Sequence, residues 1–208
     1  MDRKIKDFYD RIAKYYGMFS IFEGKYRNLL ISKLKISSAD KVLDIGCGTG
    51  EGIKTVLKYL NREGAAYGLD ISSQMIKEAE RKIKGAEAKL VVGDARKIPF
   101  EDGKFDIVIL SFTLELFKGR DIDKVLGEAG RVLKKGGKLG ILSLSKDGRM
   151  QIMKKFYIFL HCKFPAVFNC RPIEILKYLY ENNYRVCYEK NIKVYLLPAK
   201  IVICKKGK

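Results

Sequence analysis

The sequence predicts an α/β protein built on a mostly parallel β-sheet, and three observations support this prediction. Short apolar runs alternate with segments whose apolar residues recur at helical spacing, as in strands joined by crossover helices. The run at 105–110 is apolar enough for a strand that is buried on both faces. The length of 208 residues, of which 47% are hydrophobic and 32% charged, suits one globular domain.

The first forty residues are expected to be helical. Their apolar and aromatic residues recur at steps of three and four, first from Ile5 to Tyr16 and again from Tyr26 to Leu34. We therefore expect an N-terminal helical lid, 1–40, ahead of a larger sheet-containing unit, 41–208.

Five strands are expected between residues 41 and 145. The glycine cluster 46–50 follows the first strand, Ser72 or Ser73 is the expected N-cap of the second crossover helix, and Gly136-Gly137 is expected to end the helix at 122–133. The strands are expected at about 42–45, 65–70, 90–92, 105–110 and 139–144.

The C-terminal region has a different character. An apolar segment at 149–162 is flanked by lysines, and a helix is expected at about 173–182. Two strand-like runs, near 184–189 and 199–204, close the chain. We expect residues 150–182 to form a helical cap.

The chain is strongly basic, with 42 Lys and Arg against 24 Asp and Glu, a formal charge of +18. Lys outnumbers Arg 31 to 11, and the cations are spread along the whole sequence. A Lys-rich composition is typical of a heat-adapted proteome, and the alternative is an anionic partner such as RNA or acidic lipid headgroups.

Cysteine usage and hydropathy argue for a reduced, cytoplasmic protein. The five cysteines form no CxxC pair and there is one His, so no metal site is expected. Cys187 and Cys204 could lie on neighbouring strands, and the sequence leaves their pairing open. No apolar run approaches the roughly 18 residues of a membrane-spanning helix, and the N-terminus lacks a secretory signal.

Acids and glycines recur where the expected strands end. Asp44, Asp70 and Asp94 lie 24 to 26 residues apart, one strand–helix unit each, so a parallel sheet brings them to one edge. Glu51 stands where a dinucleotide-binding loop has its third glycine, and no phosphate-binding Gly-Lys-Ser/Thr follows. Asp44 beside the glycines favours a ligand that carries a positive charge and no phosphates.

Five segments between residues 40 and 145 resemble, in order and spacing, the motifs of class I S-adenosylmethionine-dependent methyltransferases. The N-terminal stretch 8–16 also resembles the first helix of the branch that contains ubiquinone- and menaquinone-biosynthesis methyltransferases. The five matching segments are 42–50, 68–72, 93–100, 105–108 and 129–137.

The resemblance implies a Rossmann-like fold, with a seven-stranded, mostly parallel sheet, helices on both faces and an antiparallel last strand. It implies S-adenosylmethionine as cofactor, with S-adenosylhomocysteine as product. Asp44 would hold the cofactor's ammonium, Asp70 its ribose hydroxyls and Asp94 its adenine amino group. The full set of expected cofactor residues is Asp44, Gly46, Cys47, Gly48, Gly50, Asp70, Ile71, Met75, Asp94, Ala95 and Ser111. The alternative is that Asp70 and Asp94 only cap helices or turns.

The segment after the fourth strand excludes several acceptors. Residues 111–117 lack the Asn/Asp-Pro-Pro-Tyr motif of amino-group methyltransferases and the paired glutamates of arginine methyltransferases. No Pro-Cys or Thr-Cys offers the nucleophile of cytosine C5 enzymes. A small-molecule or lipid-like acceptor, of quinone or phospholipid type, is the acceptor class that the family resemblance then favours.

Glu115 is the expected catalytic residue, as a base or as a receptor for a cationic acceptor. The alternative is a solvated loop carboxylate or a partner of Lys118. Tyr9, Tyr16 and Phe112 are expected to contact the acceptor, and the N-terminal aromatic residues form either a lid over it or part of the core. His161 is expected to be packed in an apolar helix.

Two other functions stay open from the sequence. The +18 charge allows a tRNA or rRNA methyltransferase, although few Arg and no appended RNA-binding module disfavour it. A non-catalytic S-adenosylmethionine-binding scaffold is the second alternative. The apolar, Lys-flanked segment at 149–168 could also attach the protein to an anionic membrane surface.

Overall fold

The computed structural model describes residues 3–85, 87–146, 171–194 and 197–207; within the first helix, the side chains of 3–4 and 17–22 lie outside the description. The helices are α1 (Arg3–Leu34), α2 (Glu51–Val56), α3 (Ser73–Lys82), α4 (Arg120–Val132) and α6 (Ile175–Glu181), with the 3-10 turn η1 (Leu114–Leu116). The strands are β1 (Lys41–Ile45), β2 (Ala65–Asp70), β3 (Ala88–Val92), β4 (Phe105–Ser111), β5 (Leu133–Leu144), β6 (Tyr184–Val194) and β7 (Leu197–Lys206).

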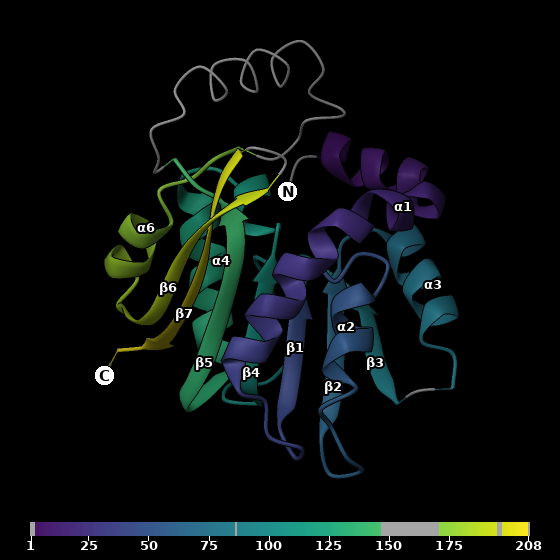
Figure 1. Ribbon diagram of the computed structural model, residues 1–208, viewed down its shortest axis with the longest axis horizontal. Coiled ribbons are helices and arrows are strands. Elements are labelled where there is room, and N and C mark those ends of the chain that lie inside the picture. Colours follow the sequence, from purple (N-terminus) through teal and green to yellow (C-terminus); the bar gives the residue numbers. More distant parts are fainter. Residues whose placement is uncertain (1–2, 86, 147–170, 195–196, 208) are drawn as a thin grey trace.

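The strands form one seven-stranded sheet in the order β3-β2-β1-β4-β5-β7-β6 (Figure 1). The first five are parallel, and the last strand, β7, runs antiparallel to both β5 and β6. The predicted fold class, a Rossmann-like and mostly parallel sheet with an antiparallel last strand, is confirmed.

Helices cover both faces of the sheet, as predicted. The core on one face includes Leu30 of α1, Ile53 of α2 and Ile76 of α3. The core on the other face includes Leu126 of α4 and Ile175 of α6. β4 contributes alternate residues to both cores, which explains its continuous apolar sequence.

The strand order reverses direction between β1 and β4. Chain connections from β1 run toward β2 and β3 on one side, and from β4 toward β5 on the other. A crevice is therefore expected where the carboxyl ends of β1 and β4 lie side by side. The glycine cluster follows β1, and Ser111 is the last residue of β4.

The N-terminal region is a single long helix with two different environments. The first turns of α1 lie across the end of the sheet near α3, and the remainder descends along the sheet face (Figure 1). Leu30, Ile31 and Leu34 are fully buried. This part of α1 belongs to the core, so the proposal of an N-terminal lid over 1–40 applies only to the first turns.

Two helix ends differ from the sequence prediction. α4 ends at Val132, before Gly136-Gly137, because Leu133 already pairs with Phe105 of β4. α2 ends at Val56, although helical spacing of apolar residues continues to Leu60. In both places a tertiary contact or a turn overrides the local apolar pattern.

The C-terminal strands match the predicted runs and extend beyond them. Cys204 on β7 pairs in register with Val186, and a register shift places Cys187 in a bulge of β6. Both thiols are free: Cys187 is exposed and Cys204 is buried. The two cysteines lie on neighbouring strands as predicted, without a disulfide between them.

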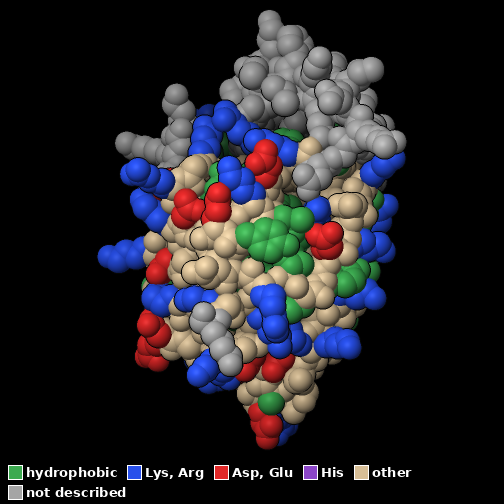
Figure 2. All heavy atoms as spheres, turned by 90° about the vertical axis from the view of Figure 1, so that its left-hand side faces the viewer, with side chains coloured by type: hydrophobic (Ala, Val, Ile, Leu, Met, Phe, Trp, Pro, Cys, Tyr) green, Lys and Arg blue, Asp and Glu red, His purple; other side chains and the backbone are tan. Residues whose placement is uncertain are grey.

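The helix expected at about 173–182 is present as α6. The apolar segment 149–162 with His161, and most of the expected cap at 150–182, lie outside the described residues. Within the described ranges no helix has the length and hydropathy needed to span a membrane. Lys and Arg side chains are spread over the face seen in Figure 2, interspersed with acids.

Candidate functional site

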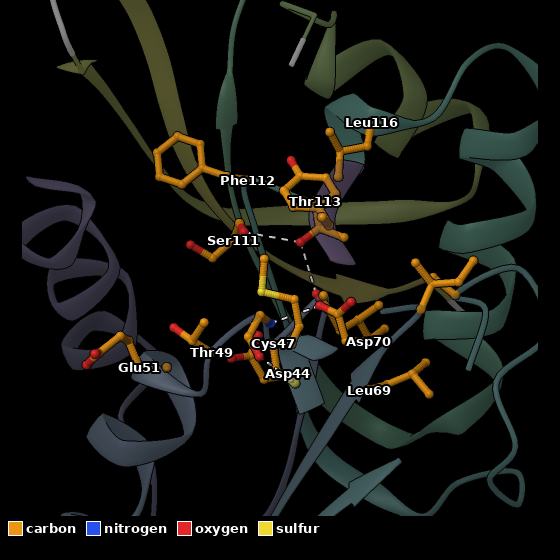
Figure 3. A pocket seen from close by; sticks show the side chains of 18 of the residues that line it. Asp44, Cys47, Thr49, Glu51, Leu69, Asp70, Ser111, Phe112, Thr113 and Leu116 are labelled. Atoms are coloured by element: carbon orange, nitrogen blue, oxygen red, sulfur yellow. Dashed lines mark hydrogen bonds between the residues drawn. The ribbon is translucent and has the colours of Figure 1, made fainter. Parts of the chain in front are cut away.

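A cavity opens at the carboxyl ends of β1, β2 and β4, with an empty volume of about 850 Å³. Its walls come from the loops after these strands and from the α1 residues Tyr9, Tyr16, Glu23 and Arg27. Figure 3 shows Asp44, Asp70 and Ser111 gathered around this opening. The topology therefore brings together lining residues from Tyr9 to Phe117, 108 positions apart in sequence.

Asp44 is the most deeply buried acid of the cavity. Its side chain is 3% exposed, and its Oδ1 has no hydrogen-bond partner in the described part of the chain. Burial raises the pKa of this carboxyl to about 7, against a lowering by Arg27 and a further rise from Asp70. A buried carboxyl oxygen without a partner is costly and suits a cationic or hydrogen-bond-donating ligand.

Gly52 in α2 makes room for the Asp44 carboxyl. A Cβ at this position would lie 2.2 Å from Asp44 Oδ2, so the carboxyl would have to move. The close approach places the carboxyl against the first turn of α2, so its position is fixed by backbone packing. Only glycine at residue 52 keeps the acid where it is.

The glycine loop is held by contacts from two directions. The Thr113 hydroxyl, after β4, lies 3.0 Å from the Ile45 carbonyl and 3.1 Å from the Ser111 carbonyl, and its single proton is donated to one of them or shared between them. A Cβ on Gly46 would lie 2.3 Å from that same Oγ1. These contacts join the end of β1 to the residues after β4, next to the cavity.

Asp70 is oriented by the backbone around it. Its Oδ2 accepts from the Gly48 N–H and its Oδ1 from the Ser72 N–H, both at 2.9 Å. Burial raises the pKa of this carboxyl, and these two hydrogen bonds lower it. Each carboxylate oxygen has further lone pairs, so Asp70 can still accept a pair of hydroxyls.

Asp94 is bound by Arg96 in a bidentate ion pair. The Arg96 Nη2 lies 2.7 Å from Oδ2 and its Nε 3.1 Å from Oδ1, and the guanidinium also reaches Asp121 at 2.8 Å. These ion pairs of Arg96 were not predicted from the sequence. They fix the rotamer of Asp94, which lines the cavity.

The first turns of α1 cover the glycine loop. Tyr16 Cε1 lies 3.7 Å from the position that a Cβ on Gly48 would take, and Tyr9 packs edge-on against Tyr16. Asp10 accepts from the Ser72 hydroxyl and from the Gln74 N–H at the start of α3. α1 is therefore anchored next to the turn that orients Asp70.

Most of the predicted site residues line the cavity. Ten of the eleven expected cofactor residues do so, and Gly50, the remaining one, is the N-cap of α2 with a φ of 82°. The three expected acceptor contacts, Tyr9, Tyr16 and Phe112, line it as well.

Glu115 occupies a different position. It lies in η1, is 1% exposed, and is not among the residues that line the cavity. Its Oε1 accepts from the Leu144 N–H at 3.3 Å, and burial raises its pKa to about 7. The alternative of a solvated loop carboxylate is therefore wrong, whereas the catalytic role of Glu115 stays a prediction.

The sequence analysis missed several lining residues, notably Glu23, Arg27 and Thr113. A signal for the first two was present, since residues 23, 27, 30 and 34 follow helical spacing and share one face of α1. Two charges on the same face as buried leucines indicate a function other than solvation. No local pattern in the sequence predicts that Thr113 lines the cavity.

The charge of the cavity is opposite to that of the chain. Among its described lining residues five are acidic and one is basic, although the protein carries +18 overall. The acidic lining consists of Glu23, Asp44, Glu51, Asp70 and Asp94, and the basic residue is Arg27. Such a lining suits a ligand with net positive charge.

Comparison with known proteins identifies a family. Residues 42–137 match the model of a methyltransferase domain. The chain is 34% identical over 154 residues to a demethylmenaquinone methyltransferase of Lactobacillus johnsonii, covering 70% of this chain and 62% of that protein. The chain thus spans less than two thirds of the length of this relative.

Two further matches cover a larger share of the matched protein. A demethylmenaquinone methyltransferase of Geobacillus sp. (strain WCH70) is 30% identical over 172 residues, covering 79% of this chain and 73% of that protein. A putative methyltransferase of Haloferax volcanii, solved with the Trm112 methyltransferase activator, aligns with a TM-score of 0.78 at 16% identity, over 98% of both chains. This last likeness concerns the fold alone. By its sequence and its architecture, the chain belongs to the class I S-adenosylmethionine-dependent methyltransferases.

Proposed function

We propose that this protein transfers a methyl group from S-adenosylmethionine to a small, largely apolar acceptor of the quinol type. The observation that carries the proposal is the buried Asp44 carboxyl, whose Oδ1 has no partner among the described residues, facing the same cavity as Asp70. The ammonium of an amino acid moiety would satisfy Asp44, and the hydroxyls of a ribose would satisfy Asp70 at the neighbouring strand end.

The residues of the cavity fit the cofactor at each of its parts. Asp44 and the Ser111 carbonyl would receive the ammonium, and Asp70 the ribose hydroxyls. Ile71 would pack against the adenine, with Asp94 accepting from its amino group. The cofactor has net positive charge and no phosphate, which matches the acidic lining.

When bound, the cofactor supplies a methyl group already activated by the positive charge of its sulfonium. The chain has then to orient the two reactants and exclude water. The glycine loop and Asp70 are held by backbone hydrogen bonds, so their geometry needs little rearrangement on binding. Tyr16 lines the cavity and packs over Gly48.

The acceptor is proposed from the apolar part of the lining. Tyr9, Tyr16, Phe112, Leu116 and Phe117 contribute aromatic and aliphatic surface on one side of the cavity. Such surface suits a planar, electron-rich ring. Two relatives named demethylmenaquinone methyltransferase support a quinol, a ring that can donate electrons to the methyl group from carbon or oxygen.

In the proposed reaction the acceptor's electron pair forms the new bond to the methyl carbon, and the carbon–sulfur bond breaks. Sulfur keeps the electrons of that bond, which gives neutral S-adenosylhomocysteine. The proton that the acceptor loses passes to water or to a carboxylate of the site. Glu115 does not line the cavity, so a proton would reach it only through an intervening group. Its role as the base stays a prediction, and its separate test is described in the Discussion.

The test is a methyl-transfer assay with isotopically labelled S-adenosylmethionine and three acceptors offered in parallel. These are a reduced short-chain demethylmenaquinone, a phosphatidylethanolamine vesicle and bulk tRNA. We expect label in the quinol, and loss of that label in Asp70→Ala. Label only in lipid or tRNA would overturn the quinol proposal and keep the methyltransferase. Cofactor binding without transfer to any of them would favour the scaffold alternative.

A further inference from the structure

The cofactor's amino acid group carries a negative charge that none of the five acids can receive. Its α-carboxylate is attached to the same carbon as the ammonium, so both must lie close together. If Asp44 receives the ammonium, the carboxylate needs a cation or N–H donors near Asp44. Among the described lining residues, Arg27 is the one cationic side chain.

Arg27 lies on the side of Asp44 that faces α1. Its Cδ is 3.5 Å from the position of a Cβ on Gly52, whose other neighbour there is Asp44 Oδ2. The residue is 8% exposed and lowers the pKa of Asp44 through its charge. Arg27 and Asp44 thus face one small region at the start of α2.

The position of Arg27 is fixed by the helix that carries it. Leu30, Ile31 and Leu34 on the following turns are fully buried against the sheet. Glu23, one turn earlier, lies 4.0 Å from the Arg27 Nη2. A guanidinium has five N–H donors in a planar fork, so it can face Glu23 and still present an edge to another carboxylate.

We propose that Arg27 binds the α-carboxylate of the cofactor, as a specificity residue supplied by α1. This inference rests on the proposed function and adds to it a residue outside the motif segments 42–137. Arg27 is the cationic side chain nearest to Asp44 among the described lining residues, so the carboxylate that accompanies the ammonium meets a positive charge there. The α-carboxylate is the negative group of this cofactor.

A second role for Arg27 has to be separated from this one. Arg27 also favours the charged form of Asp44, and its removal would weaken binding of the ammonium indirectly. The two roles differ in the ligand that they affect. Direct binding by Arg27 raises the affinity only for ligands that carry a carboxylate. Ionisation of Asp44, which Arg27 favours, raises the affinity for every ligand that carries the ammonium.

The experiment measures binding by calorimetry with two ligands. One is S-adenosylhomocysteine, and the other is its decarboxylated analogue, which keeps the amine and lacks the carboxylate. The variants are Arg27→Gln and Arg27→Lys, with Arg81→Gln as the matched control because Arg81 is 72% exposed at its side chain. Titrations at several pH values separate the two roles, because only the effect that acts through the charge of Asp44 changes with its ionisation.

We expect the wild type to prefer S-adenosylhomocysteine over the analogue, and Arg27→Gln to lose about 10- to 100-fold more affinity for S-adenosylhomocysteine than for the analogue. Arg27→Lys should recover part of that loss, and Arg81→Gln should match the wild type. Thermal melting establishes that each variant is folded. If Arg27→Gln does not fold, the wild-type preference and the Arg27→Lys variant still decide.

Three results would overturn the assignment: no wild-type preference, no loss in Arg27→Gln, or equal losses for both ligands. Equal losses would assign Arg27 to the charging of Asp44. Failure of the wild type to bind either ligand would contradict the proposed function itself, which is a different outcome.

Discussion

Asp44 shows at the scale of one residue how a binding site costs stability. Its carboxyl is buried with one oxygen that has no partner among the described residues, and its pKa is raised from 3.8 to about 7. The folded protein therefore holds a proton that the unfolded chain loses between these two pH values. Stability falls as the pH rises through this window and changes little above it.

We predict that Asp44→Asn stabilises the unliganded protein above neutral pH, by an upper limit of about 4 kcal/mol at about 1.4 kcal/mol per pKa unit. The same variant should bind S-adenosylhomocysteine about 10- to 100-fold more weakly, because the ammonium loses its charged partner. Melting curves against pH and calorimetry measure the two effects. A variant with unchanged stability and unchanged affinity would show that Asp44 is neither strained nor a ligand.

Glu115 gives a second prediction at this scale. Glu115→Gln keeps an acceptor for the Leu144 N–H and removes a carboxyl whose pKa burial raises to about 7. We expect a higher melting temperature above neutral pH and an unchanged affinity for S-adenosylhomocysteine, since the side chain does not line the cavity. Steady-state kinetics then decide the role in catalysis. Full turnover removes Glu115 from the mechanism, whereas a lower kcat at unchanged affinity keeps it.

At the residue scale, the sequence predicts the acids and glycines because each follows a strand at a regular spacing. It does not predict the partners that arise from tertiary packing. The contact of Arg96 with Asp121 and the approach of Arg27 to Asp44 depend on the packing of α4 and of α1. No local spacing encodes them.

At the scale of elements, α1 joins the core to the entrance of the cavity. Its last turns are buried against the sheet, and its first turns are held by the contacts of Asp10 with Ser72 and Gln74 at the start of α3. The Ser72 N–H also binds Asp70. We propose that the first turns of α1 act as a lid whose closure is favoured by a bound cofactor.

Asp10→Ala should free the first turns of α1 and leave the core intact, since an interaction of this capping type contributes about 1 kcal/mol. Hydrogen exchange in residues 5–16 is expected to be about fivefold faster than in the wild type. Asp7→Ala is the control, because Asp7 is exposed on the same turns. In the wild type, S-adenosylhomocysteine should slow exchange and proteolysis of this segment. Identical exchange with and without the ligand would contradict the lid.

The element boundaries also show the limit of local patterns. Apolar periodicity predicts every described strand and helix of the sheet region. It overestimates α2 and α4, because a helix ends where the chain turns or pairs with a strand. The division of α1 into a buried part and a covering part follows from contacts with the sheet, which the periodicity alone does not contain.

For the whole molecule, the distribution of charge is more informative than its sum. The surface carries most of the +18 charge as scattered Lys, while the cavity concentrates five acids and one Arg. The acidic cavity suits a cationic cofactor. Topology, not composition, produces this separation, because it collects strand-end residues from a long stretch of chain.

The most direct measurement is a crystal structure grown with S-adenosylhomocysteine. The expected result is S-adenosylhomocysteine bound in the cavity. Both ribose hydroxyls would donate to Asp70, and the ammonium of its amino acid moiety would lie on Asp44. Density for that molecule elsewhere, or an empty cavity under saturating ligand, would contradict the proposed cofactor site.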